Sequence, residues 1–567
     1  MNPILAKLLA RAAERKALES SAQAPVSIPE SIEIKSIQEA QTESLRTDLA
    51  TGITYNSKQQ QFIDTLAAGK SCVLIGAAGT GKTTATKGAI QALIQSGLVP
   101  VYENDGHKHL KNAQHGLIIC AFTRRAVANI KKGLPTDLAA SCLTVHAALE
   151  YAPEYIDITD PITMESKTTM RFSPTRNRIR PLDDSIRYCI IEESSMLGVE
   201  LFNQLKEALP AHCKFVFLGD IQQLPPVFGA AILGFKMLEL PVIELTEVYR
   251  QALDSPIISL AHRILSGVEM PLAEMHDWNT KHSANGLQFH PIKKKTHPEH
   301  ILPKIAAFFK NQIAEGKLDI NTDTILIPFN KALGTVEINK EIAQFLTEKR
   351  GTPTYEIIAG YNKLFYSVGD RVLHEKEDAE IISINSNGLY MGTKLPRKES
   401  IYIDRWGFSK ETESDSGLGS LEDDDFTSGY SMDQIDTMLS LMSDEEAAKE
   451  RRNEASHVIT IRMLADGEEI SLSKASEINA LLLGYALTIH KAQGSEYRKV
   501  YLLLHQSHNQ MIARELLYTA VTRAKEELYI ICESDTFKRG ITKQRVPGNT
   551  IAEKAEHFKG KIERGEY

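Results

Sequence analysis

The sequence lacks any run of about 18 apolar residues, the length that a membrane-spanning helix needs. Its longest apolar run, residues 481–489, is interrupted by Gly484 and Thr488. The six cysteines form no CxxC pair, and most lie within or beside apolar, strand-like runs. These absences argue against a membrane-spanning helix, a disulfide scaffold and a zinc site. We therefore expect a cytoplasmic protein in a reducing environment, with its cysteines in the core.

An excess of positive charge is also missing. The chain has 65 Lys and Arg against 73 Asp and Glu, a formal net charge of −8. This average hides a segregation, because residues 411–450 contain thirteen acidic residues and one lysine, a net charge of −12. The remainder carries +4, which permits a polyanionic partner without proving one.

The remaining composition is that of a folded protein. Apolar residues make up 42% and charged residues 24%, which excludes a wholly disordered chain and a collagen-like fibre. A length of 567 residues suggests about four domains or subdomains.

Apolar strand-like segments alternate with helical stretches over much of the chain, a pattern typical of parallel sheets with crossover helices. We expect one α/β domain over residues 51–262 and a second over residues 263–385 and 477–567. Residues 386–476 interrupt the second and are β-rich, with a hairpin turn at Asp466–Gly467.

Two segments have a different composition. Residues 1–50 are predicted to form a short basic helix, either a surface helix or a docking peptide for a partner, followed by a linker rich in Ser, Gln, Glu and Pro. Residues 411–450 are predicted to be a disordered acidic loop, which is either a solvated tether or a mimic of nucleic acid.

A phosphate-binding motif follows the first buried strand, residues 72–75. The GxxxxGK[ST] pattern stands between this strand and a helix, which is the context that the motif requires. Its glycines let the backbone wrap around phosphates, and the amide groups and the helix N-terminus point toward negative charge. The predicted nucleotide-binding residues are Gly76, Ala77, Ala78, Gly79, Thr80, Gly81, Lys82, Thr83 and Thr84. In this motif Lys82 reaches the β- and γ-phosphates and Thr83 holds Mg²⁺.

Carboxylates that suit such a site end another buried strand, residues 188–191. Glu192 and Glu193 are adjacent there, and we expect metal support from the first and general-base work from the second. A third strand leads to Asp220 and Gln223, whose polar side chains are candidates for sensing the γ-phosphate.

Taken together, these segments resemble the superfamily 1 helicases, specifically the 5′→3′ branch with RecD-like and phage Dda-like enzymes. Further strings follow in the family's order: residues 56–59 (NSKQ), 121–123 (AFT), 144–146 (TVH), 245–250 (LTEVYR), 325–330 (ILIPFN), 368–371 (VGDR), 485–496 (YALTIHKAQGSE) and 517–524 (LYTAVTRA). The sequence departs from the family at Glu192, where the family usually has Asp.

The resemblance implies two RecA-like P-loop domains with parallel sheets, which bind one ATP between them. It also implies a small β-hairpin insertion and an SH3-type β-barrel insertion at 386–476. It makes Lys82, Glu193, Gln223, Arg250 and Arg523 catalytic, the two arginines as fingers. It adds Gln59, Tyr249 and Glu496 to the nucleotide-binding residues, and it makes Thr83 and Glu192 ligands of Mg²⁺.

The resemblance also implies a path for single-stranded DNA. Its expected backbone contacts are Thr123, Thr144, His146, Asn330, Thr488 and His490. For each of these residues a helix cap or a core hydrogen bond is the alternative. The insertion at 150–184 is expected to be a β-hairpin that splits the duplex, with Phe172 as its pin; a solvated basic loop is the alternative.

The predicted activity is that of an ATP-dependent 5′→3′ DNA helicase, with ATP and Mg²⁺. Its expected partners are single-stranded DNA, duplex junctions and replication or recombination proteins that dock on the N-terminal helix or the acidic loop; we expect a monomeric motor and no membrane. An RNA-directed superfamily 1 helicase and a motor-dead regulatory protein of the same fold remain alternatives.

Overall fold

The structure is a computed structural model that describes residues 54–566, apart from several internal segments. The segments that it does not describe are 101–114, 132–133, 135–141, 160–165, 227–228, 249–253, 294–296, 361, 375–376, 389, 391–453 and 465–466. The predicted N-terminal helix, linker and acidic loop, together with Tyr249 and Arg250, lie outside the described residues. None of the described helices combines the length and apolar character that a membrane span needs.

The chain divides by its contacts into two units. Unit 1 contains residues Met1–Lys294 and Ala492–Tyr567, and unit 2 contains Lys295–Lys491. The sequence pattern assigns residues 263–294 and 492–567 to the second α/β domain, whereas their contacts group them with the first.

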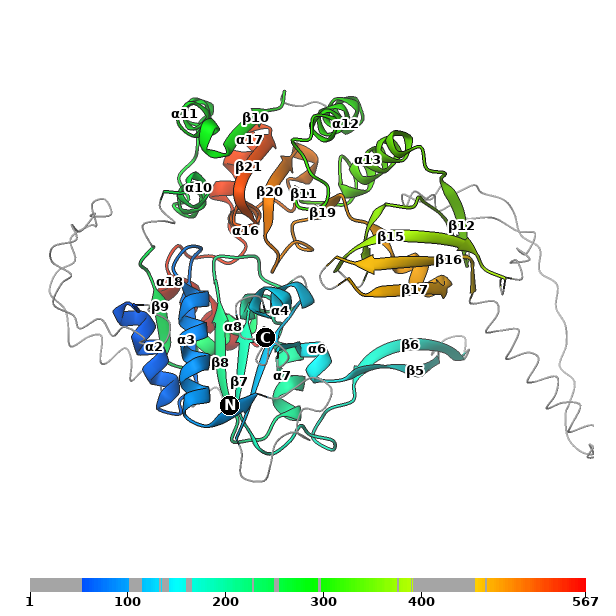
Figure 1. Ribbon diagram of the computed structural model, residues 1–567. Helices are drawn as coiled ribbons and strands as arrows, with labels where there is room; N and C mark the ends of the chain where they lie inside the picture. The colour runs from blue at the N-terminus through cyan, green and yellow to red at the C-terminus, as the bar shows by residue number, and fades with distance from the viewer. Residues whose placement is uncertain are drawn as a thin grey trace, which may run out of the picture. The chain divides into compact units, whose positions relative to one another are not determined.

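The main sheet of unit 1 is parallel, and its order is β2-β3-β7-β8-β1-β9, with β4 paired to β3 (Figure 1). Its strands are β1 (Cys72–Gly76), β2 (Leu98–Pro100), β3 (His115–Ala121), β4 (Cys142–Thr144), β7 (Ile186–Glu192), β8 (Lys214–Gly219) and β9 (Val242–Leu245). The described part of this sheet confirms the parallel arrangement that the sequence predicts.

Helices cover both faces of this sheet because its strands are apolar on both sides. Successive residues of β1 show this: Leu74 belongs to the core cluster on the side of α2 (Ser57–Ala67) and α3 (Lys82–Gln95), and Ile75 to the other. The second cluster includes residues of α7 (Val199–Ala208) and α8 (Ile232–Glu239). Two shorter helices of the unit are α4 (Arg124–Lys131) and α6 (Val145–Ala148).

A smaller parallel sheet of unit 1 has the order β10-β21-β20. Its strands are β10 (Leu287–Pro291), β20 (Tyr497–Leu504) and β21 (Ala524–Cys532). The helices that accompany it are α10 (Pro256–Leu265), α11 (Leu272–His282), α16 (Arg514–Val521) and α17 (Ser534–Thr542), with short 3₁₀ turns at Ser283–Asn285 and Gln506–His508. Helix α18 (Ile551–Glu563) contacts α8 of the main sheet, and a further 3₁₀ turn at Ser194–Met196 follows β7.

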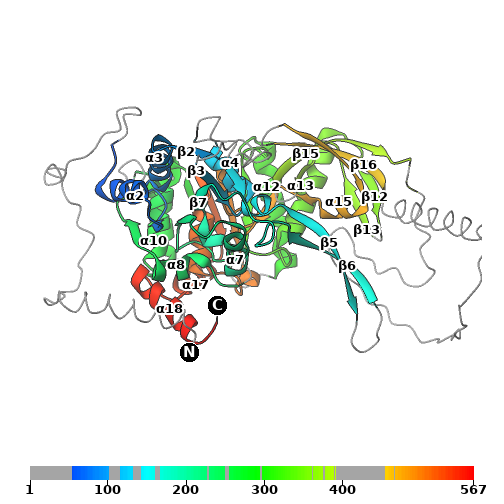
Figure 2. The same cartoon turned by 90° about the horizontal axis from the view of Figure 1, so that it is seen from below.

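An antiparallel hairpin, β5 (Tyr151–Thr159) and β6 (Ser166–Pro174), extends from unit 1 (Figure 2). The hairpin predicted within 150–184 is therefore confirmed. Its register pairs Phe172 with Pro153, toward the base of the hairpin, while the turn lies between Thr159 and Ser166. Phe172 therefore does not stand at the tip, and its role as a pin remains a prediction.

Unit 2 combines a parallel strand pair with antiparallel strands. The pair is β11 (Thr324–Ile327) and β19 (Ala486–Thr488), and its helices are α12 (Pro298–Ala314), α13 (Thr335–Arg350) and α15 (Ala475–Ala480). The antiparallel sheet has the order β17-β16-β15-β14-β18, and a separate hairpin pairs β12 with β13. These strands are β12 (Tyr355–Ala359), β13 (Asn362–Tyr366), β14 (Arg371–His374), β15 (Glu377–Ser386), β16 (Glu454–Met463), β17 (Glu469–Lys474) and β18 (Leu482–Leu483).

The antiparallel sheet extends across the predicted start of the β-rich insertion at residue 386. Strand β14 precedes this residue and β15 ends at it, and both belong to the same sheet as β16 and β17. The predicted hairpin is confirmed by the pairing of β16 with β17 and by Gly467 at φ +79°. The SH3-type assignment stays a prediction.

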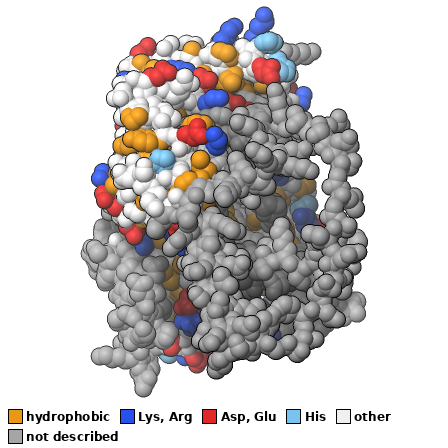
Figure 3. Space-filling view, turned by 90° about the vertical axis from the view of Figure 1, so that its right-hand side faces the viewer, with side chains coloured by type: hydrophobic (Ala, Val, Ile, Leu, Met, Phe, Trp, Pro, Cys, Tyr) orange, Lys and Arg blue, Asp and Glu red, His pale blue; other side chains and the backbone are white. Residues whose placement is uncertain are grey.

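The described surface does not segregate charge on the face shown in Figure 3. Lys and Arg side chains there stand beside Asp and Glu, with apolar side chains between them. All six cysteines are buried, as their apolar surroundings predict.

The C-terminal helix α18 is anchored in unit 1 by Phe558. Its side chain is 3% exposed and meets the ring of Phe235 edge-on, with 5.3 Å between ring centroids. A Cβ atom added to Gly234 would lie 2.3 Å from the Phe558 ring, so only glycine leaves room for this contact. The contact of Phe558 with Phe235 therefore holds residues 551–563 against α8, which covers one face of the main sheet.

We expect Phe558→Ala to lower the free energy of unfolding by about 3 kcal/mol, because it removes a buried aromatic ring and leaves a cavity. Phe558→Leu is the matched control and should cost clearly less. Urea unfolding followed by far-ultraviolet circular dichroism measures the free energy of unfolding of both variants. Equal stability of wild type and Phe558→Ala would show that α18 is not docked in this way.

Candidate active site

The phosphate loop, residues 76–84, joins β1 to α3 in unit 1. Gly79 and Gly81 adopt left-handed backbone conformations, with φ of +80° and +79°. A Cβ atom at Gly76 would lie 2.4 Å from the Thr80 hydroxyl, which is itself bonded to the Ala77 carbonyl at 2.8 Å. Glycine is required at these positions by backbone conformation and by close approach.

Lys82 begins α3, and its ammonium group lies against the phosphate loop. It donates to the carbonyl oxygens of Gly76 at 2.5 Å and Ala77 at 3.1 Å. Both acceptors are neutral, so a phosphate oxygen would be a stronger partner for the same cation. The structure therefore places Lys82 where the sequence predicts it.

Gln59 is fully buried and contacts the phosphate loop from α2. Its side-chain amide donates to the Gly81 carbonyl at 3.2 Å, and its side-chain oxygen accepts from the Asn56 amide at 3.1 Å. With the Asn56 side chain this forms a capping box at the start of α2. These contacts link the helix cap to the loop, and the adenine role of Gln59 remains a prediction.

The two adjacent glutamates lie at the end of β7, as predicted. Glu193 has φ of +51°, a conformation that a non-glycine residue adopts only when its surroundings hold it there. Burial raises the pKa of Glu192 to about 7, with the Glu193 carboxylate adding to the shift, while a hydrogen bond from Thr86 and the charge of Lys82 oppose it. The charge of Lys82 at the phosphate loop thus acts on the Glu192 carboxyl.

The raised pKa predicts a pH dependence of stability. Between pH 4.5 and about 7 the folded protein holds a proton on Glu192 that the unfolded chain releases. The free energy of unfolding contributed by this group is therefore full at low pH and is lost as the pH rises through about 7, by at most roughly 3 kcal/mol. Glu192→Gln cannot titrate, so its stability should fall less over this range in urea unfolding without Mg²⁺. Parallel pH profiles of the two proteins would contradict the prediction.

The loop at residues 220–224 follows β8 and is almost completely buried at Asp220 and Gln223. One Asp220 oxygen accepts from the Gln222 amide at 2.9 Å, and the other from the Tyr518 hydroxyl at 2.6 Å. The side-chain oxygen of Gln223 is buried and has no hydrogen-bond partner among the described residues. An acceptor left free in this way suits a residue that orients water or senses a phosphate.

The C-terminal part of unit 1 binds this 220–224 loop at several points. At Leu224, the amide donates to the Thr519 hydroxyl at 3.0 Å, and the carbonyl accepts from the Gln493 side chain at 3.0 Å. The Tyr518 hydroxyl also accepts from the Ala78 amide at 2.8 Å, which joins helix α16 to the phosphate loop. The loop after β8, the phosphate loop and α16 thus form one hydrogen-bonded assembly.

Lys554 of α18 lies beneath the same loop and is completely buried. Its ammonium donates to the carbonyls of Val546 at 3.3 Å and Ile221 at 3.5 Å and lies 3.8 Å from the Glu515 carboxylate. Burial lowers the pKa of Lys554, and the charges of Glu515 and Asp220 oppose that shift. Through its hydrogen bond to the Ile221 carbonyl, this lysine connects α18 to the 220–224 loop.

Arg523 is nearly buried at the end of α16. Its guanidinium donates to the carbonyls of Thr519 at 3.0 Å and Ser495 at 3.1 Å, and to the Thr522 hydroxyl at 3.2 Å. Its charge acts on Tyr518, whose hydroxyl contacts the phosphate loop. Lys82 and Arg523 therefore lie in the same unit, and the helix that precedes Arg523 contacts the phosphate loop through Tyr518.

The three threonines predicted to contact DNA all serve as helix or turn caps. Each hydroxyl accepts from a backbone amide three residues further on: Thr123 from Ala126 (3.1 Å), Thr144 from Ala147 (3.0 Å) and Thr488 from Lys491 (3.3 Å). Each hydroxyl keeps its own proton, which a phosphate oxygen can accept. The capping alternative is thus observed, and DNA contact remains a prediction.

The other predicted DNA contacts differ in exposure. Asn330 is exposed, and its side-chain oxygen accepts from the Thr335 hydroxyl at 2.9 Å. His146 is half-buried, and its ring lies edge-on to Tyr151 with 4.9 Å between centroids. His490 is half-buried in unit 2.

Glu496 lies apart from these contacts. It is exposed and forms an ion pair with Lys525 at 2.9 Å. A solvated pair of this kind adds little stability, so its presence does not decide whether Glu496 binds nucleotide.

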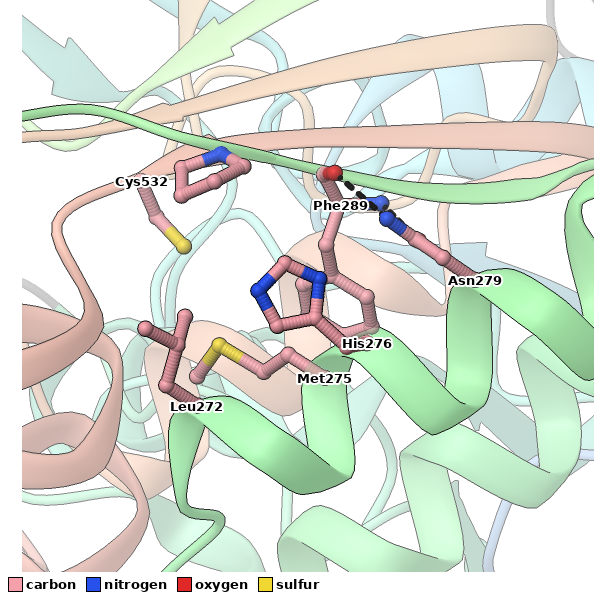
Figure 4. Close-up of a pocket in the computed structure, with 7 residues that line it drawn as sticks. Leu272, Met275, His276, Asn279, Phe289 and Cys532 are labelled. Atoms are coloured by element: carbon pink, nitrogen blue, oxygen red, sulfur yellow. Dashed lines mark hydrogen bonds between the residues drawn. The ribbon is translucent and has the colours of Figure 1, made fainter.

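A small apolar pocket lies between α11 and β10 rather than at the phosphate loop (Figure 4). Leu272, Met275, Phe289 and Asn279 are among the residues that line it. The Asn279 side chain accepts from the Phe289 amide at 2.6 Å and donates to the Phe289 carbonyl at 2.8 Å. Asn279 thereby satisfies the edge strand β10, which gives this pocket a structural explanation.

Two residues of the assembly were not predicted from the sequence. Tyr518 stands in a string that carries the family resemblance, but its hydroxyl contacts lie 440 and 298 residues away along the chain. Lys554 stands outside every motif. The sequence around this lysine, on an amphipathic helix, contains no pattern that would indicate a buried side chain.

Comparison with known proteins agrees with this geometry. Residues 59–229 match the family model of an AAA domain, and residues 483–531 match that of a UvrD-like helicase C-terminal domain. The first contains the phosphate loop and the 220–224 loop, and the second contains Tyr518 and Arg523.

Two curated relatives are similar over most of this chain. The ATP-dependent RecD2 DNA helicase of Deinococcus radiodurans is 26% identical over 496 residues, which cover 87% of this chain and 51% of that protein. The ATP-dependent DNA helicase dda of Enterobacteria phage T4 is 25% identical over 479 residues, which cover 80% of this chain and 93% of that protein. The chain thus spans about half the length of the RecD2 relative.

A solved Pif1 helicase from Bacteroides, in complex with ADP-AlF3 and ssDNA, has a TM-score of 0.45 at 15% identity and covers 90% of this chain and 98% of its own. The family-model matches and the two curated relatives confirm the resemblance found in the sequence. The chain is thus similar to the ATP-dependent DNA helicases RecD2 and dda, and two of its segments match an AAA domain and a UvrD-like helicase C-terminal domain.

Proposed function

We propose that the protein is an ATP-dependent DNA helicase that translocates 5′→3′ on single-stranded DNA and unwinds duplex. The observation that carries this proposal is the hydrogen-bonded assembly of the phosphate loop, the 220–224 loop and helix α16. It brings a phosphate cradle, a polar sensing loop and the segment that ends in Arg523 into contact. A motor requires that hydrolysis at the phosphate loop changes the structure of other segments, and these contacts can transmit such a change.

In this proposal ATP binds the phosphate loop, and Lys82 exchanges its carbonyl partners for phosphate oxygens. Glu193 accepts the proton of the attacking water, and the free oxygen of Gln223 helps to orient that water. Arg523, and Arg250 outside the described residues, stabilise charge on the γ-phosphate oxygens. Gln59, Tyr249 and Glu496 complete the predicted nucleotide-binding set.

The residues present fit Mg²⁺. The Thr83 hydroxyl and the Glu192 carboxylate are oxygen donors of the kind that Mg²⁺ prefers, and Glu192 interacts with Lys82 of the phosphate loop. When bound, Mg²⁺ neutralises phosphate charge. A glutamate is one methylene longer than the aspartate usual in the family, and Glu192 would hold the ion through water.

For DNA, the proposal assigns backbone contacts to residues of both units. Thr123, Thr144 and His146 belong to unit 1, and Asn330, Thr488 and His490 belong to unit 2. Because these groups are mostly neutral hydroxyls, amides and imidazoles, they bind phosphates without reading sequence. Gripping and releasing DNA in turn by the two sets converts each hydrolysis cycle into a step.

The test of this function is ATP hydrolysis with and without single-stranded DNA or RNA. We expect hydrolysis to require Mg²⁺ and to rise strongly with DNA, and DNA affinity to fall with salt because counterions are released. Stronger stimulation by RNA would instead support an RNA-directed helicase. No hydrolysis under any of these conditions would support the motor-dead alternative and overturn the proposal.

A further inference from the structure

The hydroxyl of Tyr518 is held between the phosphate loop and the loop after β8. It accepts from the Ala78 amide at 2.8 Å and lies 2.6 Å from an Asp220 oxygen, and the side chain is completely buried. A hydroxyl has a single proton, and the Asp220 oxygen is the acceptor in this contact. The proton of Tyr518 therefore goes to Asp220, and its oxygen lone pair goes to the Ala78 N–H.

This contact uses an amide of the phosphate loop. Amides of such a loop bind phosphate oxygens, so the phenolic oxygen occupies a position that an anion's oxygen can also take. One N–H makes one good hydrogen bond at a time. Burial raises the pKa of Tyr518 well above its usual range, so the group stays a neutral hydroxyl and is a weaker acceptor than a charged phosphate.

The surroundings allow this single contact to change without detaching helix α16. The neighbouring Thr519 hydroxyl accepts from the Leu224 amide at 3.0 Å, and Gln493 donates to the Leu224 carbonyl at 3.0 Å. These bonds keep α16 against the 220–224 loop.

We propose that Tyr518 is a positioning residue that responds to nucleotide: the triphosphate takes the Ala78 N–H from its hydroxyl, and the released hydroxyl changes its hold on Asp220. This proposal rests on the proposed function and deepens it. Binding at the phosphate loop is thereby transmitted to the loop that carries Gln223. Tyr518 contacts no reacting atom in this scheme and acts through Ala78 and Asp220.

The test compares Tyr518→Phe with wild type. Phenylalanine keeps the ring and the packing but leaves the Ala78 N–H without its partner, so a phosphate oxygen no longer has a competitor. We expect the Kd for a non-hydrolysable ATP analogue with Mg²⁺ to fall by about fivefold, the equivalent of one neutral hydrogen bond. The kcat of DNA-stimulated hydrolysis should fall at the same time, because binding is no longer transmitted to Asp220.

The matched control is Tyr188→Phe. Tyr188 is another buried tyrosine of unit 1, and its hydroxyl donates to the Leu66 carbonyl at 2.9 Å, away from the phosphate loop. This variant should lose stability without tighter analogue binding. An unchanged or weaker analogue affinity in Tyr518→Phe would overturn the proposal. A wild-type protein that fails to bind the analogue would instead overturn the proposed function, so the two failures are distinguishable.

Discussion

Replacing Lys82 by alanine should abolish DNA-stimulated ATP hydrolysis while leaving DNA binding intact. The ammonium group lies on the phosphate loop, 2.5 Å from the Gly76 carbonyl, and it is the charged group that the loop offers to a triphosphate. Removing one such stabilising donor from a water-poor site costs roughly 10²–10³-fold in turnover. The candidate DNA contacts lie on other residues, so DNA affinity should not follow.

A second lysine of the same helix provides the control for this experiment. Lys87 of α3 is half-buried and carries the same charge one turn beyond the loop. Lys87→Ala should hydrolyse ATP at a rate close to wild type, as measured by phosphate release with saturating DNA. Normal turnover in Lys82→Ala would refute the assignment of the phosphate loop.

Arg523→Ala should lower turnover by about 10³-fold or more while changing ATP affinity much less, because an arginine finger acts mainly on charge that develops in the transition state. In the structure Arg523 follows α16, the helix whose Tyr518 hydroxyl contacts Ala78 of the phosphate loop. To act as a finger, the guanidinium must leave its present carbonyl partners on Thr519 and Ser495. Single-turnover hydrolysis and analogue binding, measured separately, give the two quantities.

Two further variants separate a finger from a structural arginine. Arg523→Lys keeps the charge but loses the planar fork, and should recover only part of the rate. Arg545 is also partly buried and donates to the Met511 carbonyl at 3.1 Å, so Arg545→Ala should reduce stability without a selective loss of turnover. A loss of ATP affinity alone in Arg523→Ala would contradict the finger role.

The parts of the fold that the sequence predicts are those with a local cause. Strand β1 is an uninterrupted apolar run, and Gly79 and Gly81 occupy positive-φ positions that few other residues tolerate. The glutamates at the end of β7 follow a buried strand directly, so their place at the sheet edge could be predicted. Each of these features depends on residues within about ten positions of each other.

The parts that the sequence does not predict depend on distant partners. The contact of Tyr518 with Ala78 spans 440 residues, and Lys554 reaches Ile221 across 333. No periodicity or spacing within α16 or α18 points to these partners. For the same reason the grouping of residues 492–567 with unit 1 could not be anticipated from strand and helix patterns.

The residue at which the antiparallel sheet begins could not be predicted from the sequence for a different reason. Strands β14 and β15 contain only short apolar stretches, and the sequence does not show whether a strand pairs in parallel or antiparallel. Their pairing with each other and with β16 decides the matter. The predicted insertion boundary at 386 thus lies at the end of β15, within one antiparallel sheet.

The most direct test of the central claim is unwinding of DNA duplexes that carry a single-stranded tail at either end, with ATP and Mg²⁺. The account predicts strand separation for duplexes with a 5′ tail, none for blunt duplexes, and none in the Lys82→Ala variant. Separation that requires a 3′ tail, or that proceeds equally well without ATP, would contradict it.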